Sequence, residues 1–298
     1  MGGSQAPSGR RLAAIHAWLL LLPAAVLLVA FTHYPIVATL VDSLFSTPRA
    51  GRPATFVGLE NYRFMAADPV FWQVMRNNLV FALGTIPASM ALALLMAVWV
   101  NRRLPARALV RLAYVTPTIL PMVAVANIWL FFYTPQFGLL DQLRQALGAA
   151  PHNWLGSAST VMGCLVVMTI WKEAGFFMVF YLAALQLVPP DLEEAAAIEG
   201  TGRWTFFRRV TLPLVTPTTL FVLVNATINS FKLVDQLFVL TKGGPDNASN
   251  LLLYYLYEVA FGFNDRAYAA ALTAVLLAIL AGLALVQFAL VERRVHYR

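Results

Sequence analysis

Charged residues are scarce in this chain. Only 12% of its 298 residues are Asp, Glu, Lys or Arg, whereas 60% are hydrophobic and the mean hydropathy is +0.70. Soluble domains carry about a quarter charged residues, so this composition excludes an ordinary soluble protein and indicates a membrane protein. The net charge of +7 does not predict nucleic-acid binding, because the arginines occur in short clusters between apolar runs rather than on one basic face.

Residues that catalyse reactions or bind metals are also few. Cys164 is the single cysteine, which excludes an internal disulfide, and the four histidines (His16, His33, His152 and His296) are scattered without the spacing of metal ligands. The chain has no nucleotide loop of the form G-x-x-x-x-G-K-[ST] and no recognisable nucleophile and base pair. We therefore predict no catalytic residue, no metal site and no cofactor in this chain.

Long apolar runs dominate what is present. Six stretches are long enough to cross a bilayer as helices, covering residues 13–41, 78–100, 109–133, 158–187, 214–240 and 267–291. They predict an all-α polytopic protein with an N-terminal tail over 1–12, a six-span domain over 13–291 and a C-terminal tail over 292–298. The first run has no small-residue cleavage site, so we interpret it as a retained anchor rather than a signal peptide.

The basic residues predict the orientation of these spans. With the N-terminus inside, twelve arginines fall on the cytoplasmic side and seven basic residues on the other side, where they are spread over longer loops. Because positive charge is retained inside, both termini are predicted to be cytoplasmic, which agrees with an even number of spans.

Prolines lie within several spans, and each removes a backbone hydrogen bond and can bend its helix. Bent helices can enclose a cavity, although proline is also simply more frequent in membrane helices. The residues concerned are Pro23, Pro35, Pro87, Pro117, Pro121 and Pro217.

A hydrophilic segment, 189–213, separates the fourth and fifth spans. We expect Asp191 to cap a short helix with Glu194 three residues later, Gly200 and Gly202 to form a left-handed turn, and a second short helix to end at Pro213. Its apolar surface is too large to leave in water. One interpretation is a helix pair lying on lipid headgroups.

The spacing within this segment resembles the cytoplasmic signature of permease subunits in bacterial ATP-driven importers. It reads Glu194-Ala195-Ala196, three residues, Gly200, nine residues, Val210, one residue and Leu212-Pro213, with Val210 where Ile is more usual. The resemblance implies a type I importer permease fold in the bacterial inner membrane. It also implies that the two short helices sit in a cleft of a separate ATPase subunit, which Glu194 contacts and which binds ATP and Mg.

Further residues resemble the carbohydrate-uptake branch of that family, which includes permeases for maltose and glycerol 3-phosphate. They are Tyr34-Pro35, the run from Phe56 to Tyr62, Trp171-Lys172, and Thr241-Lys242-Gly243-Gly244-Pro245. The resemblance implies a heterodimer with a second permease, two ATPase subunits, and a periplasmic or lipid-anchored binding protein, all within membrane lipid. With no large outer domain, contact with the binding protein is expected at 134–157 and at 241–250, including Thr241, Gly243, Gly244 and Pro245.

Polar residues in the spans predict a solute pathway. On the fifth span, Thr218, Asn225, Asn229, Lys232 and Gln236 would form one stripe of a continuous helix. Such a stripe is costly against lipid, roughly 2.5–3.5 kcal/mol for a charged residue alone. A weaker stripe comprises Asn78, Thr85 and Ser89, and Lys172 with Glu173 lies in the fourth span.

Two interpretations of these groups remain open. They can link helices by hydrogen bonds and ion pairs, Lys172 with Glu173 and Lys232 with Asp235, or they can line a cavity for a polyhydroxylated solute. The resemblance favours Asn225 and Asn229 as pathway residues. A free lysine would favour an anionic solute such as a glycerol phosphate, but Trp-Lys recurs in family members with different substrates, so we expect a neutral sugar or polyol moved by alternating access.

Two other classes of protein are less well supported. A secondary transporter or channel would be indicated by inverted repeats, and no clear internal repeat is present. A membrane enzyme would need acids or histidines gathered at one interface, and the histidines do not cluster.

Overall fold

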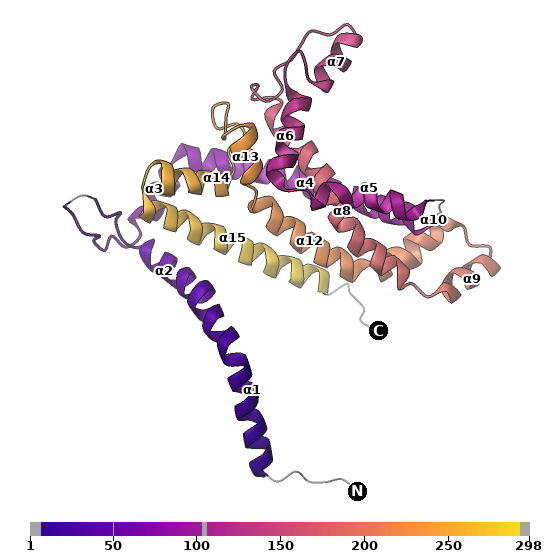
Figure 1. Cartoon of the computed structure of the whole chain (residues 1–298), viewed down its shortest axis with the longest axis horizontal. Coiled ribbons are helices and arrows are strands. Elements are labelled where there is room, and N and C mark those ends of the chain that lie inside the picture. Colours follow the sequence, from indigo (N-terminus) through magenta and orange to yellow (C-terminus); the bar gives the residue numbers. More distant parts are fainter. Residues whose placement is uncertain (1–6, 50, 103–105, 293–298) are drawn as a thin grey trace. The chain divides into compact units, whose positions relative to one another are not determined.

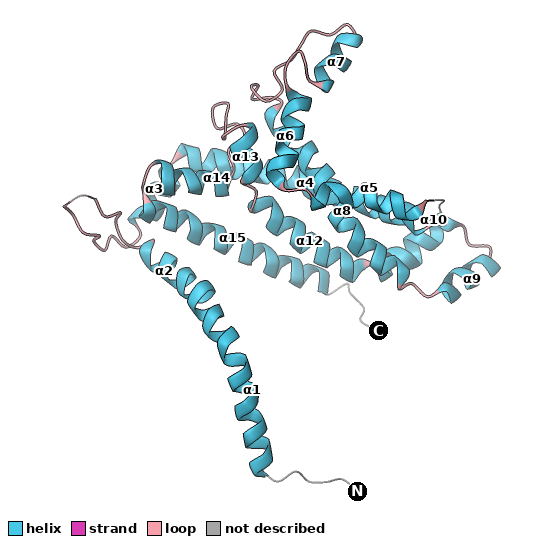
Figure 2. Ribbon diagram, in the orientation of Figure 1, coloured by secondary structure: helices cyan, strands magenta, loops and turns pink. Residues whose placement is uncertain are grey.

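The computed structural model describes residues 7–49, 51–102 and 106–292. Within these ranges the chain is helical, and its only extended pairings are two isolated bridges, Phe45 with Phe56 and Arg49 with Arg52 (Figure 2). The predicted all-α class is confirmed. The chain divides into two compact units: Met1–Met65 with Val259–Val275, and Ala66–Glu258 with Leu276–Arg298.

The first unit begins with a long apolar helical rod. It comprises α1 (Pro7–Leu28), a five-residue π-helical turn (Val29–His33) and α2 (Tyr34–Asp42). The stretch His16–Asp42 is long and apolar enough to cross a membrane, and no residue in its most apolar part is buried by the rest of the chain. It matches the predicted first span, and Pro23 and Pro35 do not interrupt it.

The residues from Phe56 to Tyr62 have a structural role in the connection between α2 and α3. The Asn61 side chain, in α3 (Glu60–Ala67), donates to the carbonyls of Ser43 at 2.8 Å and Phe45 at 2.9 Å. The Tyr62 hydroxyl lies 2.7 Å from the Ser43 hydroxyl, and Gly58 has a φ of +59° that glycine adopts readily. These residues therefore fix the end of α2 to the start of α3.

The second unit is built on α4 (Pro69–Asn101), α8 (Val161–Gln186) and α12 (Thr216–Phe231) (Figure 1). The Asp68 carboxylate accepts from the Val70 N–H at 2.9 Å, and proline occupies the first helical position, so α4 begins well before residue 78. It continues through Pro87 without a break. α4 packs along α8, where small residues allow the two helices to approach closely. Buried residues of this interface include Ala93, Ala97 and Val100 of α4 and Phe177, Met178 and Tyr181 of α8.

The third predicted span is not one continuous helix. α5 (Arg107–Ile119) and α6 (Met122–Tyr133) meet at an angle of 99°, with Leu120 and Pro121 at the break. Pro121 has no N–H, and Pro117 removes a further hydrogen bond one turn earlier, so the helix is weakened at this point. The predicted span over 109–133 therefore matches this pair in extent, and the bend lies at Pro121, one of the two prolines expected to bend it.

The fifth predicted span is also broken. α12 ends at Phe231 and is followed by a non-helical stretch before α13 (Asp235–Leu240), whereas the 66° bend between Arg203–Leu214 and Thr216–Leu240 lies at the start of the predicted span, 214–240. The Ser230 carbonyl accepts from the Asn78 side chain at 3.4 Å, and the Ser230 hydroxyl bonds the Thr227 carbonyl at 2.8 Å. These side-chain bonds compete with the helical ladder. The continuous stripe through Lys232 and Gln236 was therefore wrong.

The remaining helices connect these spans. Among the described residues, four helices are individually long and apolar enough to cross a membrane, and the count reaches six if each bent pair is one span. The shorter elements are α7 (Leu139–Ala146), α9 (Pro190–Ile198), α10 (Arg203–Phe206), a π turn (Phe207–Thr211), α11 (Leu212–Leu214), α14 (Leu252–Tyr257) and a second π turn (Glu258–Gly262), before α15 (Arg266–Glu292).

Candidate functional site

The hydrophilic segment after α8 forms two short helices with a defined turn. At the end of α9, the Thr201 N–H donates to the Ala196 carbonyl at 2.8 Å and the Gly200 N–H donates to the Ala197 carbonyl at 3.2 Å. This paired pattern is a Schellman cap, which needs a left-handed residue, and Gly200 has a φ of +70°. Gly200 therefore sets the direction in which the chain leaves α9.

Three details of this segment differ from the sequence-based expectation. α9 begins at Pro190 after Pro189, so Asp191 lies in the first turn and makes no capping hydrogen bond. Gly202 has a φ of −65° and precedes α10 in an extended conformation. Pro213 does not end the second helix, because a preceding π turn, in which the Leu212 N–H reaches the Phe207 carbonyl, allows the helix to continue to Leu214.

The surface of α9 and α10 is open. Along α9 every residue except Ala196 is exposed, including Glu194 and Ala195, and Ile198 is 88% exposed. On α10, Trp204 is 71% exposed while its ring stacks on Phe207. The chain thus presents an apolar and acidic helix pair that its own described residues do not cover, beyond the C-terminal end of α8 (Figure 1).

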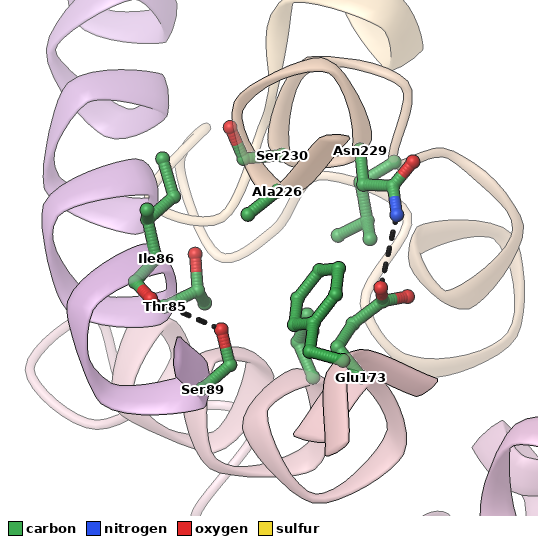
Figure 3. Close-up of a pocket in the computed structure, with 10 residues that line it drawn as sticks. Thr85, Ile86, Ser89, Glu173, Ala226, Asn229 and Ser230 are labelled. Carbon is green, nitrogen blue, oxygen red and sulfur yellow. Dashed lines mark hydrogen bonds between the residues drawn. The ribbon is translucent and has the colours of Figure 1, made fainter. Parts of the chain in front are cut away.

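A small pocket lined by both apolar and polar side chains lies between α4, α8 and α12 (Figure 3). Its volume is about 20 Å³, which is room for about one water molecule and far too little for a sugar. The lining residues are Thr85, Ile86, Ser89, Thr169, Glu173, Phe177, Ala226, Asn229, Ser230 and Leu233.

Two of the five predicted pathway residues meet at this pocket. The Asn229 side-chain amide on α12 donates to Glu173 Oε2 on α8 at 2.9 Å (Figure 3). Asn225 does not line the pocket, and its amide bonds the Phe221 carbonyl one turn back at 2.8 Å. Lys232 is exposed at the C-terminal end of α12.

Lys172 does not line the pocket but forms hydrogen bonds at the break between α5 and α6. Its ammonium donates to the carbonyls of Pro117 at 3.1 Å, Thr118 at 3.4 Å and Leu120 at 2.8 Å. The Thr118 hydroxyl in turn donates to the Lys172 carbonyl at 2.9 Å. These are carbonyls that the break between α5 and α6 leaves without helical partners, so Lys172 supports the bend.

The weaker polar stripe predicted from the sequence contains two residues that line the pocket. Thr85 and Ser89 belong to the weaker polar stripe of α4, and both line the pocket. Thr169 and Ser230 were missed. Thr169 lies one turn before Glu173 on α8, so helical spacing from Glu173 was the signal that could have found it.

Comparison with known proteins decides the family. Residues 89–297 match the family described as binding-protein-dependent transport system inner membrane component. The chain belongs to this family. The matched range includes α8, α9, the turn at Gly200 and α12, together with the part of α4 from residue 89 onward.

Curated relatives of this permease cover most of its length. It is 32% identical over 272 residues to the sulfoquinovosyl glycerol transport system permease protein SmoG of Agrobacterium fabrum, covering 91% of this chain and 87% of SmoG. It is 31% identical to the lactose transport system permease protein LacF of Rhizobium radiobacter, covering 92% and 93%. It is 29% identical to the sn-glycerol-3-phosphate transport system permease protein UgpA of Pectobacterium atrosepticum, covering 94% and 95%.

The fold of this permease is shared with a solved importer. A crystal structure of a bacterial ABC transporter involved in the import of the acidic polysaccharide alginate superposes with a TM-score of 0.83 at 21% identity, covering 95% of this chain and 96% of the other. The fold and the family identify this chain as the membrane permease of a binding-protein-dependent ABC importer. It is a transport subunit, and ATP hydrolysis resides on a separate polypeptide.

The 241–250 loop of this permease is held to α4 by amide side chains. Gln73 donates to the Asp246 carbonyl at 2.9 Å, and Asn77 donates to the Asn247 carbonyl at 2.7 Å and the Asn250 carbonyl at 3.0 Å. Asn78 continues the series, since its oxygen accepts from the Leu252 N–H at 2.7 Å.

Within the same loop, the predicted contact residues form one compact turn. The Ser249 hydroxyl lies 2.8 Å from the Thr241 hydroxyl and donates to the Gly244 carbonyl at 2.6 Å. Gly243 has a φ of +79° and closely approaches the Asn250 side chain. Pro245 follows Gly244 and is partly exposed. This defined shape is a suitable docking surface, although its partner stays a prediction.

The 134–157 loop is organised around one buried carboxylate. Asp141 in α7 accepts from the backbone N–H groups of Gln136 at 2.8 Å and His152 at 3.1 Å, and from the Trp154 ring N–H at 2.8 Å. These hydrogen bonds, that from Gln136 above all, together with the charge of Arg144, hold the pKa of Asp141 below its ordinary value despite burial. Arg144 also lies over the Trp154 ring at 5.6 Å.

Proposed function

We propose that this permease forms one half of the pathway of an importer for a neutral sugar or polyol. A second, nonidentical permease would complete the pathway, and two ATPase subunits and an extracytoplasmic binding protein would complete the assembly. The relatives named for lactose and for trehalose and maltose support a neutral sugar, whereas those named for sulfoquinovosyl glycerol and glycerol 3-phosphate have anionic solutes. A solved relative described as a complex with an alginate-bound periplasmic protein supports the binding protein.

The observation that carries the proposal is the uncovered α9 helix with its Gly200 cap. A rigid turn holds an exposed helix with Glu194, Ala195 and Ala196 on its surface, and such a surface is suited to insertion into a partner. Val210, Leu212 and Pro213 then lead into the fifth span. Movement of an ATPase subunit bound here would be transmitted to α8 and α12, which α9 and α10 directly join. ATP and Mg would bind that subunit.

The small pocket supports alternating access. In the described structure α4, α8 and α12 enclose about 20 Å³, so a sugar can enter only after these helices separate. Glu173 and Asn229 are then the groups exposed to the solute. The distribution of positive charge supports a cytoplasmic position for α9 and both termini, with the loops 134–157 and 241–250 outside.

A second candidate solute is glycerol 3-phosphate, because UgpA relatives cover most of the chain. That reading requires a cation at the pathway. The geometry weighs against it, since Lys172 is occupied at the α5–α6 break and Lys232 does not line the pocket.

The test is a comparison of Glu194→Ala with Glu193→Ala. Both carboxylates are exposed on α9 and make no hydrogen bond within the described structure, so neither substitution should change the thermal stability of the permease. We expect Glu194→Ala to reduce recovery of the ATPase subunit on gentle purification, and solute uptake, by about tenfold, while Glu193→Ala retains both. Mass spectrometry identifies what is recovered. Equal behaviour of the two variants at full uptake would refute the role of Glu194.

A further inference from the structure

Glu173 is the only ionisable residue among the ten that line the pocket. Its partner there is neutral, the Asn229 amide at 2.9 Å. Within the described part of the chain no lysine or arginine forms an ion pair with it, because the adjacent Lys172 ammonium is held by three carbonyls at the α5–α6 break. No cation of the described residues is therefore bonded to Glu173 at the pocket.

The two hydroxyl groups that α4 contributes to the pocket have already donated their hydrogens. The Thr85 hydroxyl donates to the Phe81 carbonyl at 2.7 Å, and the Ser89 hydroxyl donates to the Ile86 carbonyl at 3.1 Å. A hydroxyl has one hydrogen to donate but two lone pairs. Both side chains therefore present acceptor oxygens to the pocket.

Ser230 and Thr169 add further acceptors. The Ser230 hydroxyl donates to the Thr227 carbonyl at 2.8 Å, and the Thr169 oxygen accepts weakly from Gln236 at 3.4 Å. Asn229 is the one side-chain amide in the lining, and one of its two N–H hydrogens is donated to Glu173. The second Asn229 hydrogen and the Thr169 hydroxyl hydrogen are the donors left to the pocket, so acceptors on its polar side chains outnumber free donors.

We propose that this acceptor-rich pocket admits the hydroxyl groups of an uncharged sugar or polyol and rejects anionic solutes, with Glu173 as the specificity-determining residue. The inference rests on the proposed function and narrows its substrate class. Hydroxyl hydrogens are complementary to the wall, whereas phosphate, sulfonate and carboxylate oxygens are acceptors that would face other acceptors and a carboxylate in a poorly hydrated site. A solute of the kind for which UgpA is named is therefore excluded.

The hydrogen bond between Glu173 and Asn229 stabilises the closed state of the pocket. It joins α8 to α12 and satisfies both side chains while the pocket is closed. When the helices separate, solute hydroxyls donate to Glu173 and accept from Asn229, so neither polar group is left unpaired in the membrane. The exchange needs no change of protonation.

Thiol chemistry tests the electrostatics without knowledge of the solute. Ser89→Cys is introduced on a Cys164→Ser background, which otherwise contains no cysteine, and the complete importer is trapped with ATP and vanadate. Reaction rates are measured with cationic and anionic methanethiosulfonate reagents of similar size and divided by their rates with a free thiol. We expect the cationic reagent to be favoured by about tenfold, the effect of one nearby charge at a partly shielded site.

The variant Glu173→Gln separates charge from structure. A glutamine oxygen can still accept from Asn229, so the helix link is retained while the charge is removed. The preference for the cationic reagent should fall to near one, whereas Glu60→Gln, at an exposed position on α3, should leave it unchanged. A preference that is absent with Glu173 in place, or unaltered by Glu173→Gln, would overturn the proposal, as would a thiol at position 89 that reacts in no nucleotide state.

Uptake by the same complex distinguishes the failure of this inference from failure of the proposed function. Ligands of the co-purified binding protein are screened among neutral sugars, polyols, sugar phosphates and sugar acids, and the binders are tested for ATP-dependent uptake in vesicles. Uptake of neutral solutes alone supports both proposals. Uptake of an anionic solute would overturn the role of Glu173 and leave the importer intact, whereas recovery of no ATPase and no binding protein would overturn the importer itself.

Discussion

At the scale of single residues, Lys172 shows how a charged side chain in a membrane helix can serve the backbone. We predict that Lys172→Met lowers the stability of the permease by roughly 2–4 kcal/mol, because it leaves three buried carbonyls unpaired. The measurement is the thermal midpoint in detergent, compared with Lys172→Arg, which retains donors. Unchanged stability together with abolished uptake would instead support a role for Lys172 in the solute pathway.

Gly175 is a second residue whose role is structural. A Cβ built at Gly175 would overlap the Tyr114 carbonyl oxygen, so α5 and α8 can pack as they do only with glycine here. We predict that Gly175→Ala prevents stable folding, or lowers stability by more than about 3 kcal/mol, because backbone must move.

Gly163 on the same helix is the matched control. A Cβ at that position meets nothing within 4 Å, so Gly163→Ala should be neutral or slightly stabilising. The yield of monodisperse protein and its thermal midpoint distinguish the two. Equal tolerance would mean that α5 is not seated on α8 as described.

The polar residues of the fifth span show what the sequence could and could not reveal. Asn229 was correctly expected to face inward, since helical spacing from Thr218 and Asn225 placed it on a polar stripe. The same stripe did not predict that Asn225 would bond its own helix or that Lys232 would end it. Side-chain bonds within a helix depend on rotamers and neighbours, which helical periodicity does not encode.

At the scale of elements, the prolines predicted where helices are weak but not whether a helix breaks at that point. Pro87 lies within an unbroken α4, whereas Pro121 accompanies a 99° bend. The difference lies in the neighbours: Lys172 supplies hydrogen bonds to the carbonyls around the bend. The turn at Gly200 was predictable because a left-handed residue at a helix end is a local requirement.

The α7 loop carries the pH dependence that can be tested. The pKa of Asp141 is lowered by hydrogen bonds to its ionised form, so its stabilising effect is present above its ordinary value of 3.8 and is lost as the pH falls through the lowered pKa. We predict that hydrogen exchange of residues 136–154, corrected for the intrinsic effect of pH, stays slow at pH 4 and above and accelerates only at lower pH.

Asp141→Asn tests the same point at neutral pH. The substitution removes the charge that accepts three N–H groups, so exchange in 136–154 should already be fast at pH 7, whereas Asp246→Asn in the exposed part of the other loop should have no effect there. Slow exchange in Asp141→Asn would show that neutral hydrogen bonds are sufficient.

At the scale of the whole molecule, the family and the all-α class followed from the sequence, whereas the number of continuous spans did not. The Glu-Ala-Ala signature and the apolar runs are local patterns, so they can be recognised without knowledge of tertiary contacts. Whether a bent pair crosses the membrane depends on both halves and their surroundings, and length alone allows four to six spans.

Topology labelling decides between those counts. If the bent α5–α6 pair crosses the membrane, Ser159 before α8 lies outside and Thr205 after α8 lies in the cytoplasm; if the pair is re-entrant, the two positions exchange sides. Both residues are exposed, so Ser159→Cys and Thr205→Cys on the Cys164→Ser background can be labelled with a membrane-impermeant thiol reagent. We predict that intact spheroplasts label only the Ser159→Cys variant and that lysis is needed for Thr205→Cys. The opposite pattern would place the α9 helix outside the cell, where it could not meet an ATPase, and would contradict the six-span arrangement and the coupling role of Glu194 together.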